Sequence, residues 1–396
     1  MTAYAMGRAL LNNGYRVTVI ALGPERTGGG PDEDRHHIDH WRKMGAECDI
    51  LSDGITRLSR FDPRRLLSRD RIFPSRALRP SLEACLVRLR PDAMLLYHWE
   101  ALAAAWGIRT VPKVAGVGDP VHLPGLFRRE FQRTNNAAGG RRTLWYQAAN
   151  GWVSRFQQIE GMVSMLNECA VAGAFAAHHA SMLREMGASR CRYFRTPVAD
   201  PGFKGVSSRP GTWRILHIGH LNGTATLAGI QLLVEGVLPQ LLKKVAPDAL
   251  EIHLVGGKLD SVPSELRRKF DHPSIRLRGQ ITPPDEEFHK ASILIVPTPI
   301  ELGIRVRIIT GFSFGVPIVA HVANKAGIPE LIDGENCLLA SDSAGLAAAC
   351  LRLRADADLQ ARLRSGARAT FEKYFSLTTA GKVIVESLDG AIQRVS

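Results

Sequence analysis

Two arginines and two glutamates carry the chemistry of the stretch formed by residues 293–339. Arg305 and Arg307 place two fixed positive charges where a helical pattern begins, and Glu301 and Glu330 add carboxylates to the same stretch. Guanidinium groups bind phosphates through paired hydrogen bonds, and the N–H groups at a helix start favour the same ligand. The residue types therefore predict a site for a phosphate-bearing ligand. The alternative is that these charges only solvate the surface of a helix.

Hydrophobic patterning predicts the elements that must position these side chains. In order they are a strand buried on both faces, a helix, a second strand and the start of a further helix, at Ile293–Val296, Arg305–Phe314, Ile318–Ala320 and Gly327–Glu330. Strand-to-helix junctions of this kind lie at the carboxyl edge of a parallel sheet. Open α/β sheets bind their ligands at that edge.

The same residues carry a family resemblance. The run E-L-G-I-R-V-R-I-I-T-G-F-S-F-G-V-P-I-V-A, followed by G-I-P-E-L-I-D-G-E-N-C-L-L, resembles the donor-site signature of family 4, or group 1, glycosyltransferases. The match is dense here and extends loosely over most of the chain. It implies the GT-B fold, an α/β architecture of two Rossmann-like doubly wound domains that face each other across a cleft.

The resemblance also implies a division of the chain. We expect an acceptor-side domain over residues 1–200, a nucleotide-sugar donor domain over 209–375 and a C-terminal helix over 376–396 that packs back toward the first domain. A helix pattern at Thr2–Asn13 precedes the strand Val17–Ile20, with a glycine- and acid-rich loop at Gly23–Asp34. The family places a strand and a glycine-rich turn before that helix. We favour a start codon further upstream over the loss of an interior strand.

The resemblance assigns roles to individual residues. The implied catalytic residues are Glu301, His98, which ends the strand pattern Pro91–Tyr97, and Asp119, which follows the pattern Val111–Val117. A strand-end histidine can instead be a structural group. The implied donor-binding residues are Gly219, His220, Asn222, Thr224, Gly256, Gly303, Arg305, Arg307, Thr310 and Glu330.

The chain departs from the family pattern at three places, and one of them is that Glu301 lies one residue off the usual spacing of the family's pair of glutamates. Thr310 replaces the glutamate that commonly binds the donor ribose, and the loop Gly219–Thr226 lacks the arginine and lysine that grip the diphosphate. Arg305 and Arg307 stand where a G-x-R-x-K variant of the family would place its cations. Because the stretch 293–339 has no D-x-D triplet of the sort that holds a divalent cation for nucleotide-sugars, we predict a metal-independent reaction with no cofactor beyond the nucleotide-sugar substrate.

Composition limits the partners and the compartment. The net charge is +13, and residues 1–205 hold 29 Lys and Arg against 19 Asp and Glu. Without zinc spacing or aromatic RNA-binding motifs we predict no nucleic acid, and instead a lipid-linked or polysaccharide acceptor and an anionic membrane surface. The arginine-rich stretch Arg57–Arg79 fits such a surface; the alternative is a solvated helical face.

Further composition signals favour a cytoplasmic protein, peripheral on the inner face of a membrane. No run resembles a signal peptide or reaches the roughly 20 apolar residues of a membrane span. The six cysteines show no C-x-x-C or metal spacing, which indicates free thiols in a reducing compartment.

Three functions fit these patterns. The leading interpretation is a retaining hexosyltransferase-type glycosyltransferase that uses a nucleotide-sugar donor in polysaccharide biosynthesis. The second is a non-catalytic GT-B subunit with weak or no nucleotide binding, which Thr310 and the missing Arg/Lys pair favour. The third is a nucleotide-sugar epimerase of the same fold.

Overall fold

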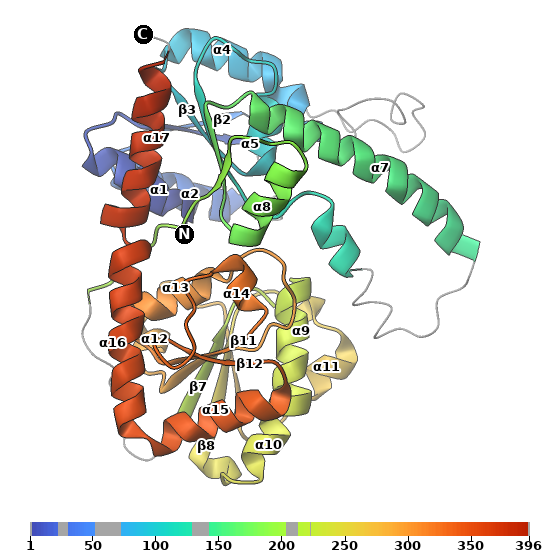
Figure 1. Ribbon diagram of the computed structural model, residues 1–396, viewed down its shortest axis with the longest axis vertical. Helices are drawn as coiled ribbons and strands as arrows, with labels where there is room; N and C mark the ends of the chain where they lie inside the picture. Colours follow the sequence, from blue (N-terminus) through green and yellow to red (C-terminus); the bar gives the residue numbers. More distant parts are fainter. Residues whose placement is uncertain are drawn as a thin grey trace. The chain divides into compact units, whose positions relative to one another are not determined.

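The computed structural model describes residues 2–22, 31–51, 73–128, 142–202, 213–221 and 223–394. The chain divides into two compact units (Figure 1). Unit 1 comprises Met1–Leu126, Asn136–Pro197 and Ala380–Ser396, and unit 2 comprises Phe127–Asn135 and Val198–Thr379. The last helix of the chain, α17 (Lys382–Ile392), therefore belongs to unit 1 although it follows unit 2 in sequence.

Unit 1 contains two parallel sheets in its described residues. The larger has the order β3-β4-β5-β6, with strands at Met94–Tyr97, Lys113–Val117, Val171–Ala174 and Cys191–Tyr193. The smaller pairs β1 (Thr18–Leu22) with β2 (Glu47–Leu51). The strand patterns identified in the sequence are thus present, as parallel strands with their carboxyl ends at one edge.

Besides α17, the named helices of unit 1 are α1, α2, α4, α5, α7 and α8, with a 3-10 turn before α4. Their bounds are Thr2–Asn12, Pro31–Lys43, Arg79–Leu89, His98–Ala104, Arg142–Asn167 and Ala177–Glu185, and the 3-10 turn is Pro74–Leu78. The loop expected at Gly23–Asp34 is wrong for its last residues, because α2 begins at Pro31. Proline is favoured at the first helical position, where its fixed φ suits the helix and its missing N–H costs nothing. Most of the arginine-rich stretch Arg57–Arg79 lies outside the described residues.

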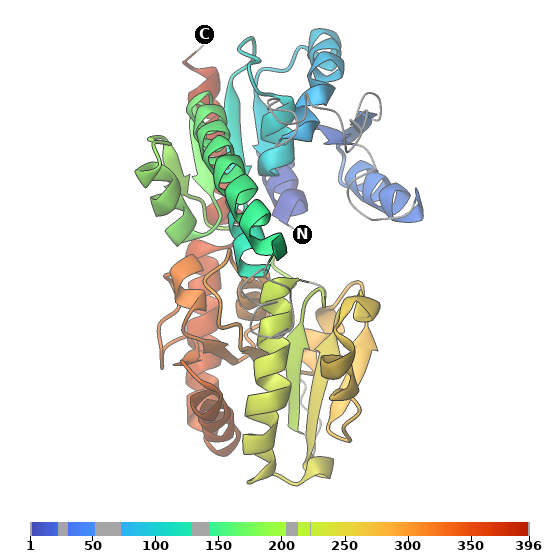
Figure 2. The same cartoon turned by 90° about the vertical axis from the view of Figure 1, so that its right-hand side faces the viewer.

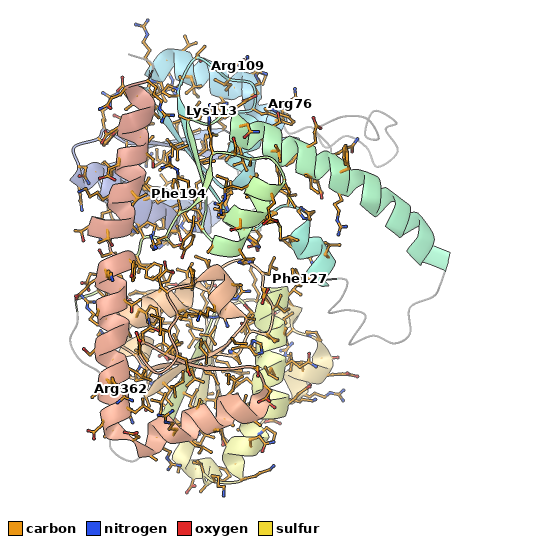
Figure 3. The ribbon with its side chains drawn as sticks, in the orientation of Figure 1. Arg76, Arg109, Lys113, Phe127, Phe194 and Arg362 are labelled. Carbon is orange, nitrogen blue, oxygen red and sulfur yellow. The ribbon has the colours of Figure 1, made fainter. Side chains whose placement is uncertain are left out.

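Small residues in the strands of unit 1 let aromatic rings lie directly on the sheet. A Cβ atom added at Gly173 would lie 2.0 Å from the ring of Phe194, and one added at Gly116 would lie 2.7 Å from the ring of Phe175. At the start of β4, the ammonium group of Lys113 donates to a carboxylate oxygen of Glu168 at 2.6 Å, and both side chains of this ion pair are largely shielded from solvent. Figure 3 labels Lys113 and Phe194. The rings and this ion pair hold the strands of unit 1 in place.

Unit 2 is built on one parallel sheet of six strands with the order β12-β11-β10-β7-β8-β9. The strands, from β7 to β12, are Trp213–Ile218, Leu250–Val255, Ile275–Gly279, Ile293–Val296, Ile318–His321 and Leu338–Ala340. The chain moves outward from β7 through β8 to β9 and then returns to the other side of β7 with β10. The strand order therefore reverses between β7 and β10, which makes their carboxyl ends the ligand-binding position of a doubly wound sheet.

Alternate side chains of the unit 2 strands enter two separate cores. Ile293 and Ile295 pack in one core with α9, α10 and α15, whereas Leu294 and Val296 pack in the other with α13. Figure 1 shows α9 and α10 on one side of the strands and α13 and α16 on the other. Because side chains alternate along a strand, an unbroken apolar run is what a sheet covered on both faces requires.

The helices of unit 2 connect and cover these strands. From α9 to α16 they are Thr224–Leu232, Leu238–Leu242, Ser264–Arg268, Asp285–His289, Val306–Ser313, Asn324–Gly327, Ser343–Ala355 and Ala357–Tyr374. A π-helical turn, Leu233–Val237, joins α9 to α10 in one continuous helix beside the strands (Figure 2). All six cysteines are free, as predicted, and burial raises the pKa of Cys350 to about 12.

The continuous helix Thr224–Leu242 corrects the expectation that no segment is long and apolar enough for a membrane span. By length and composition it could cross a membrane, with a mean hydropathy of 1.4, and it is the one such helix among the described residues. However, 61% of the apolar window is buried, and Ile230, Leu233 and Leu241 are completely covered in the core of unit 2. Its apolar character is therefore used in packing the helix against the sheet.

Candidate functional site

The carboxyl ends of β7 and β8 meet at glycines. Gly219 follows β7 with a φ of +153°, and a Cβ atom there would lie 2.2 Å from Nη1 of Arg307. A Cβ atom at Gly256, which follows β8, would lie 1.9 Å from the carbonyl oxygen of Gly219. Only glycine fits at this spacing, so the site is walled by backbone groups at the point where the strand order reverses.

Arg307 is the central charge of this site. Its Nη1 donates to the carbonyl oxygen of Ile218 at 2.7 Å, and its Nη2 donates to Oγ1 of Thr298 at 3.2 Å. Burial, together with the charge of Arg305, lowers the pKa of Arg307 to about 9, which leaves the guanidinium protonated at neutral pH. No carboxylate of the described residues lies within 4.0 Å of it. A buried, unpaired positive charge is stabilised by an incoming anion.

Arg305 is the residue that precedes α13, and it interacts electrostatically with Arg307. Its Nη2 donates to the carbonyl oxygen of Leu302 at 2.6 Å, so the side chain folds back over its own loop. The two predicted phosphate-binding arginines are therefore neighbours at the amino end of α13. The helix dipole adds partial positive charge at the same place.

The loop between β10 and α13 is held by contacts with the next strand. Gly303 has a φ of +65°, and its carbonyl oxygen lies 2.4 Å from where a Cβ atom of Gly327 would be. The side-chain amide of Asn324 donates to the carbonyl oxygens of His321 and Val296 at 2.8 and 3.3 Å. These contacts position Glu301 at the exposed end of the loop.

The expected helix start at Gly327–Glu330 is wrong. Helix α14 ends at Gly327, and Glu330 lies in a turn with its side chain 8% exposed. Ile328 is extended because the proline that follows it disfavours the helical region, and Gly327 is pinned against the carbonyl of Gly303. The carbonyl oxygen of Glu330 accepts a hydrogen bond from the amide of Asn336 at 2.8 Å, which fixes the turn.

Three further predicted donor-binding residues have known positions, and one does not. Thr310 lies one turn inside α13, buried, and its hydroxyl donates to the carbonyl oxygen of Val306 at 3.1 Å. His220 is exposed in the loop after β7, and Thr224 opens α9. Asn222 lies outside the described residues. Their contacts with a donor remain predictions.

In unit 1 the structure links the strand ends that carry two of the three predicted catalytic residues, His98 and Asp119. His98 follows β3 with a φ of +67°, a strained conformation for a residue with a side chain, and its ring lies 2.9 Å from where a Cβ atom of Gly118 would be. The indole N–H of Trp99 donates to the carbonyl oxygen of Asp119 at 2.7 Å and ties the two strand ends together. Burial lowers the pKa of His98, so its imidazole is neutral at pH 7.

Sequence reasoning missed two buried histidines, one in each unit. His179, in α8, is completely buried with Nδ1 3.6 Å from a carboxylate oxygen of Asp119. Its signal was the histidine pair His178-His179 immediately after a strand. His217 lies inside β7, where its Nδ1 is 3.2 Å from the carbonyl oxygen of Ile295, and burial beside the positive charge of Arg307 lowers its pKa to about 3.

The sequence and the structure of the chain resemble those of known proteins. Residues 212–356 match the family described as glycosyl transferases group 1, a range that includes every predicted donor-binding residue. The predicted resemblance is confirmed. Residues 212–356 of unit 2 are similar to group 1 glycosyltransferases, and the chain has the GT-B fold. No curated protein sequence matches the chain.

Solved structures of GT-B glycosyltransferases resemble the whole chain at low identity. Sucrose-phosphate synthase from Thermosynechococcus elongatus is 14% identical with a TM-score of 0.70, covering 100% of this chain and 93% of its own. HepE from Anabaena, in complex with UDP-glucose, is 15% identical with a TM-score of 0.66, covering 95% and 100%. A glycosyltransferase from Rickettsia africae is 12% identical with a TM-score of 0.64, covering 99% and 94%.

Acidification is expected to destabilise unit 2 through His217. Because its pKa is about 3 in the folded chain and near 6.5 when unfolded, the unfolded chain binds more protons between these values, and stability falls as the pH falls through this window. Urea unfolding of His217→Gln between pH 6.5 and 5 should show a slope smaller by up to about 1.4 kcal/mol per pH unit. Equal slopes in variant and wild type would contradict the burial of a neutral His217.

Proposed function

We propose that the protein transfers a hexose from a UDP-sugar to a hydroxyl group of a lipid-linked or polysaccharide acceptor. One observation carries the proposal: the buried charge of Arg307, without a carboxylate partner, lies where β7 and β10 end. A diphosphate at this position would supply the missing negative charge. The group 1 family match, and the UDP and UDP-glucose that HepE binds in its solved complexes, support a UDP-sugar donor.

The proposed reaction breaks the bond between the anomeric carbon and a phosphate oxygen. The electron pair of that bond stays on UDP, the acceptor oxygen bonds to the anomeric carbon, and the acceptor proton passes to a base or to the leaving phosphate. Negative charge therefore grows on the diphosphate while positive charge grows on the sugar. The negative charge on the diphosphate is stabilised by Arg305, Arg307 and the N–H groups of the loop after β7. Glu301 faces the positive charge on the sugar.

Unit 1 is proposed to bind the acceptor. His98, neutral because of burial, can accept or donate a hydrogen bond to a hydroxyl group, and Asp119 together with His179 supplies a carboxylate beside it. The strained backbone of His98 is consistent with a functional group held in place by its surroundings. The proposal places the protein on the cytoplasmic face of a membrane, where lipid-linked acceptors are exposed.

A second candidate function is a subunit of the same fold without activity. Two observations favour it: the hydroxyl of Thr310 is committed to its own helix, and the loop after β7 lacks a cation. Such a subunit would lack measurable affinity for UDP. Nucleotide binding therefore separates the two candidates before any acceptor is known.

Removing the arginine charges is expected to weaken UDP binding. Calorimetry with the pair Arg305→Gln and Arg307→Gln should show UDP affinity reduced by about a hundredfold or more, because each of the two charge-assisted contacts is worth about 1.5–3 kcal/mol. The matched control, Arg267→Gln with Arg268→Gln, removes two exposed charges of the same unit and should leave affinity unchanged. Titrations with GDP and ADP test which nucleotide base the site prefers. UDP affinity that survives the first pair would overturn the phosphate site.

Glu301 is expected to act on turnover and not on binding. Because its carboxylate is exposed at the end of the loop, Glu301→Gln should preserve UDP affinity. Release of UDP from a UDP-sugar should fall by roughly a hundredfold or more, as for the loss of a group that stabilises transition-state charge. Glu335→Gln, an exposed carboxylate of the same unit, is the control. Wild-type turnover in the Glu301 variant would remove it from the chemistry.

Chelation is expected to leave turnover unchanged. We propose that guanidinium and backbone N–H groups neutralise the diphosphate without a divalent cation, and with retention of anomeric configuration. UDP release should therefore be equal with EDTA and with added Mg²⁺ or Mn²⁺. If EDTA abolished turnover and Mg²⁺ or Mn²⁺ restored it, the metal-independent reaction would be ruled out while the nucleotide site would still stand.

A further inference from the structure

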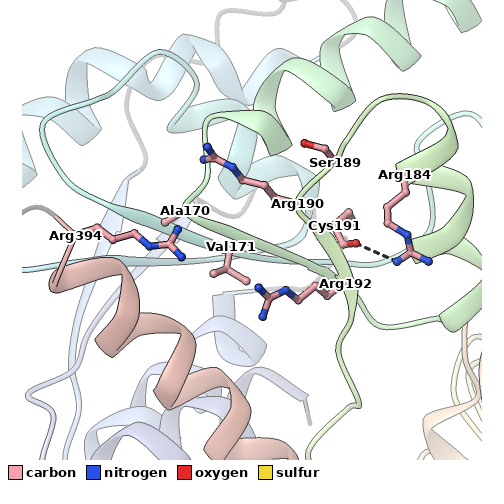
Figure 4. Close-up of a pocket in the computed structure, with 8 residues that line it drawn as sticks. All are labelled: Ala170, Val171, Arg184, Ser189, Arg190, Cys191, Arg192 and Arg394. Carbon is pink, nitrogen blue, oxygen red and sulfur yellow. Dashed lines mark hydrogen bonds between the residues drawn. The ribbon is translucent and has the colours of Figure 1, made fainter.

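A pocket in unit 1 is lined by four arginines (Figure 4). It has a volume of about 380 Å³ and lies at the amino ends of β5 and β6. Its lining residues are Ala170, Val171, Arg184, Ser189, Arg190, Cys191, Arg192 and Arg394. Arg394 follows the end of α17, so two segments far apart in the chain contribute positive charge to one hollow.

Two of these arginines are oriented by backbone carbonyl groups. Arg184 donates from Nη1 to the carbonyl oxygen of Cys191 at 3.1 Å, and Arg190 donates from Nη1 to the carbonyl oxygen of Cys169 at 3.2 Å. Arg184 also donates from Nη2 to Oγ of Ser181 at 3.0 Å, and both side chains keep further guanidinium donors that bond to nothing among the described residues. The bonds hold the side chains in place without neutralising them, which reduces the entropy lost when a ligand binds.

The other two arginines face each other across the pocket. Figure 4 shows Arg192, from β6, and Arg394, from the chain after α17, directing their guanidinium groups toward Val171. Within the described part of the chain, neither makes a hydrogen bond or an ion pair, and no carboxylate lies within 4.0 Å of any of the four guanidinium groups. Four like charges around one hollow repel one another, and an anion in the hollow would relieve that repulsion.

The pocket is distinct from the groups already assigned in unit 1. His98 and Asp119 follow the carboxyl ends of β3 and β4, whereas the arginines lie at the amino ends of β5 and β6 in the same parallel sheet. β5 alone separates the two edges by roughly 13 Å, at about 3.3 Å per residue. A ligand in the pocket therefore does not occupy the reacting end of the sheet.

We propose that this pocket binds a phosphate group. Arginine forks match the oxygens of phosphate, and several of them around a hollow recognise a doubly charged anion better than a singly charged one. The volume suits one or two phosphates with a small attached group. The phosphate belongs either to a soluble compound or to a lipid headgroup, and both present the same oxygens to the arginines.

The test is binding of inorganic pyrophosphate to the full chain by calorimetry at about 0.15 M salt, where the screening length is roughly 8 Å. Arg192→Gln with Arg394→Gln keeps the apolar stems and removes two charges. This double variant should bind one equivalent of pyrophosphate fewer than the wild type, or bind that equivalent with an affinity lower by roughly tenfold or more. The pair Arg305→Gln and Arg307→Gln should retain this equivalent, which separates the pocket from the proposed donor site.

The control pair is Arg8→Gln with Arg109→Gln, two exposed arginines of unit 1 outside the pocket. Unchanged pyrophosphate binding in the control supports the site; an equal loss in both pairs shows a net-charge effect and overturns it. Wild-type binding in the Arg192/Arg394 pair also overturns it. Thermal melts of all variants verify folding.

Vesicle flotation distinguishes the two sources of the phosphate. Phosphatidylcholine vesicles are compared with the same vesicles containing phosphatidic acid. Capture that needs phosphatidic acid and is lost in the Arg192/Arg394 pair assigns the pocket to a lipid headgroup. Pyrophosphate binding without such capture assigns it to a soluble phosphate compound. Failure of both pyrophosphate and phosphatidic acid to bind would refute the site.

Discussion

A buried guanidinium at the point where the strand order reverses is the constraint on which unit 2 depends. Arg307 ties the end of β7 to the loop after β10 through the carbonyl of Ile218 and the hydroxyl of Thr298. Burial, together with its charge, keeps His217 neutral, and the φ of +153° at Gly219 favours glycine where its guanidinium group approaches the backbone. The positive charge that the fold must accommodate is thus placed where an anion can approach the strand ends.

Both units deliver their polar groups at the carboxyl edge of a parallel sheet, but by different local means. Unit 2 uses glycines, so that backbone groups line the site. Unit 1 uses a strained histidine, His98, packed on Gly118 and linked to Asp119 through the indole of Trp99. Backbone walls suit a charged diphosphate, whereas side-chain hydrogen-bonding groups suit the hydroxyl of an acceptor.

Part of the excess positive charge of the first half of the chain lies around one pocket in unit 1. Residues 1–205 hold 29 basic against 19 acidic residues, and three of the arginines, Arg184, Arg190 and Arg192, converge on one pocket. Arg394 joins them because the end of the chain returns to unit 1. Part of the excess positive charge is therefore concentrated at the amino edge of the larger sheet of unit 1.

The sequence by itself determined most of the strands, the two-unit organisation and the family resemblance. Apolar runs such as Ile293–Val296, closed by proline or glycine, depend on local patterning that any buried parallel strand must show. The arginines at positions 305 and 307 were likewise identifiable, because their spacing from Gly303 is a property of the chain itself.

Only the tertiary structure decided which partners these residues have. Arg307 bonds to Ile218, 89 residues away, and His179 meets Asp119 from another helix, so neither contact leaves a local pattern. The carbonyl oxygen of Gly303 lies so close to Gly327 that a side chain would not fit there. The arginine pocket needs both β6 and the returning end of the chain. Contacts between distant segments, and not residue spacing, made these features.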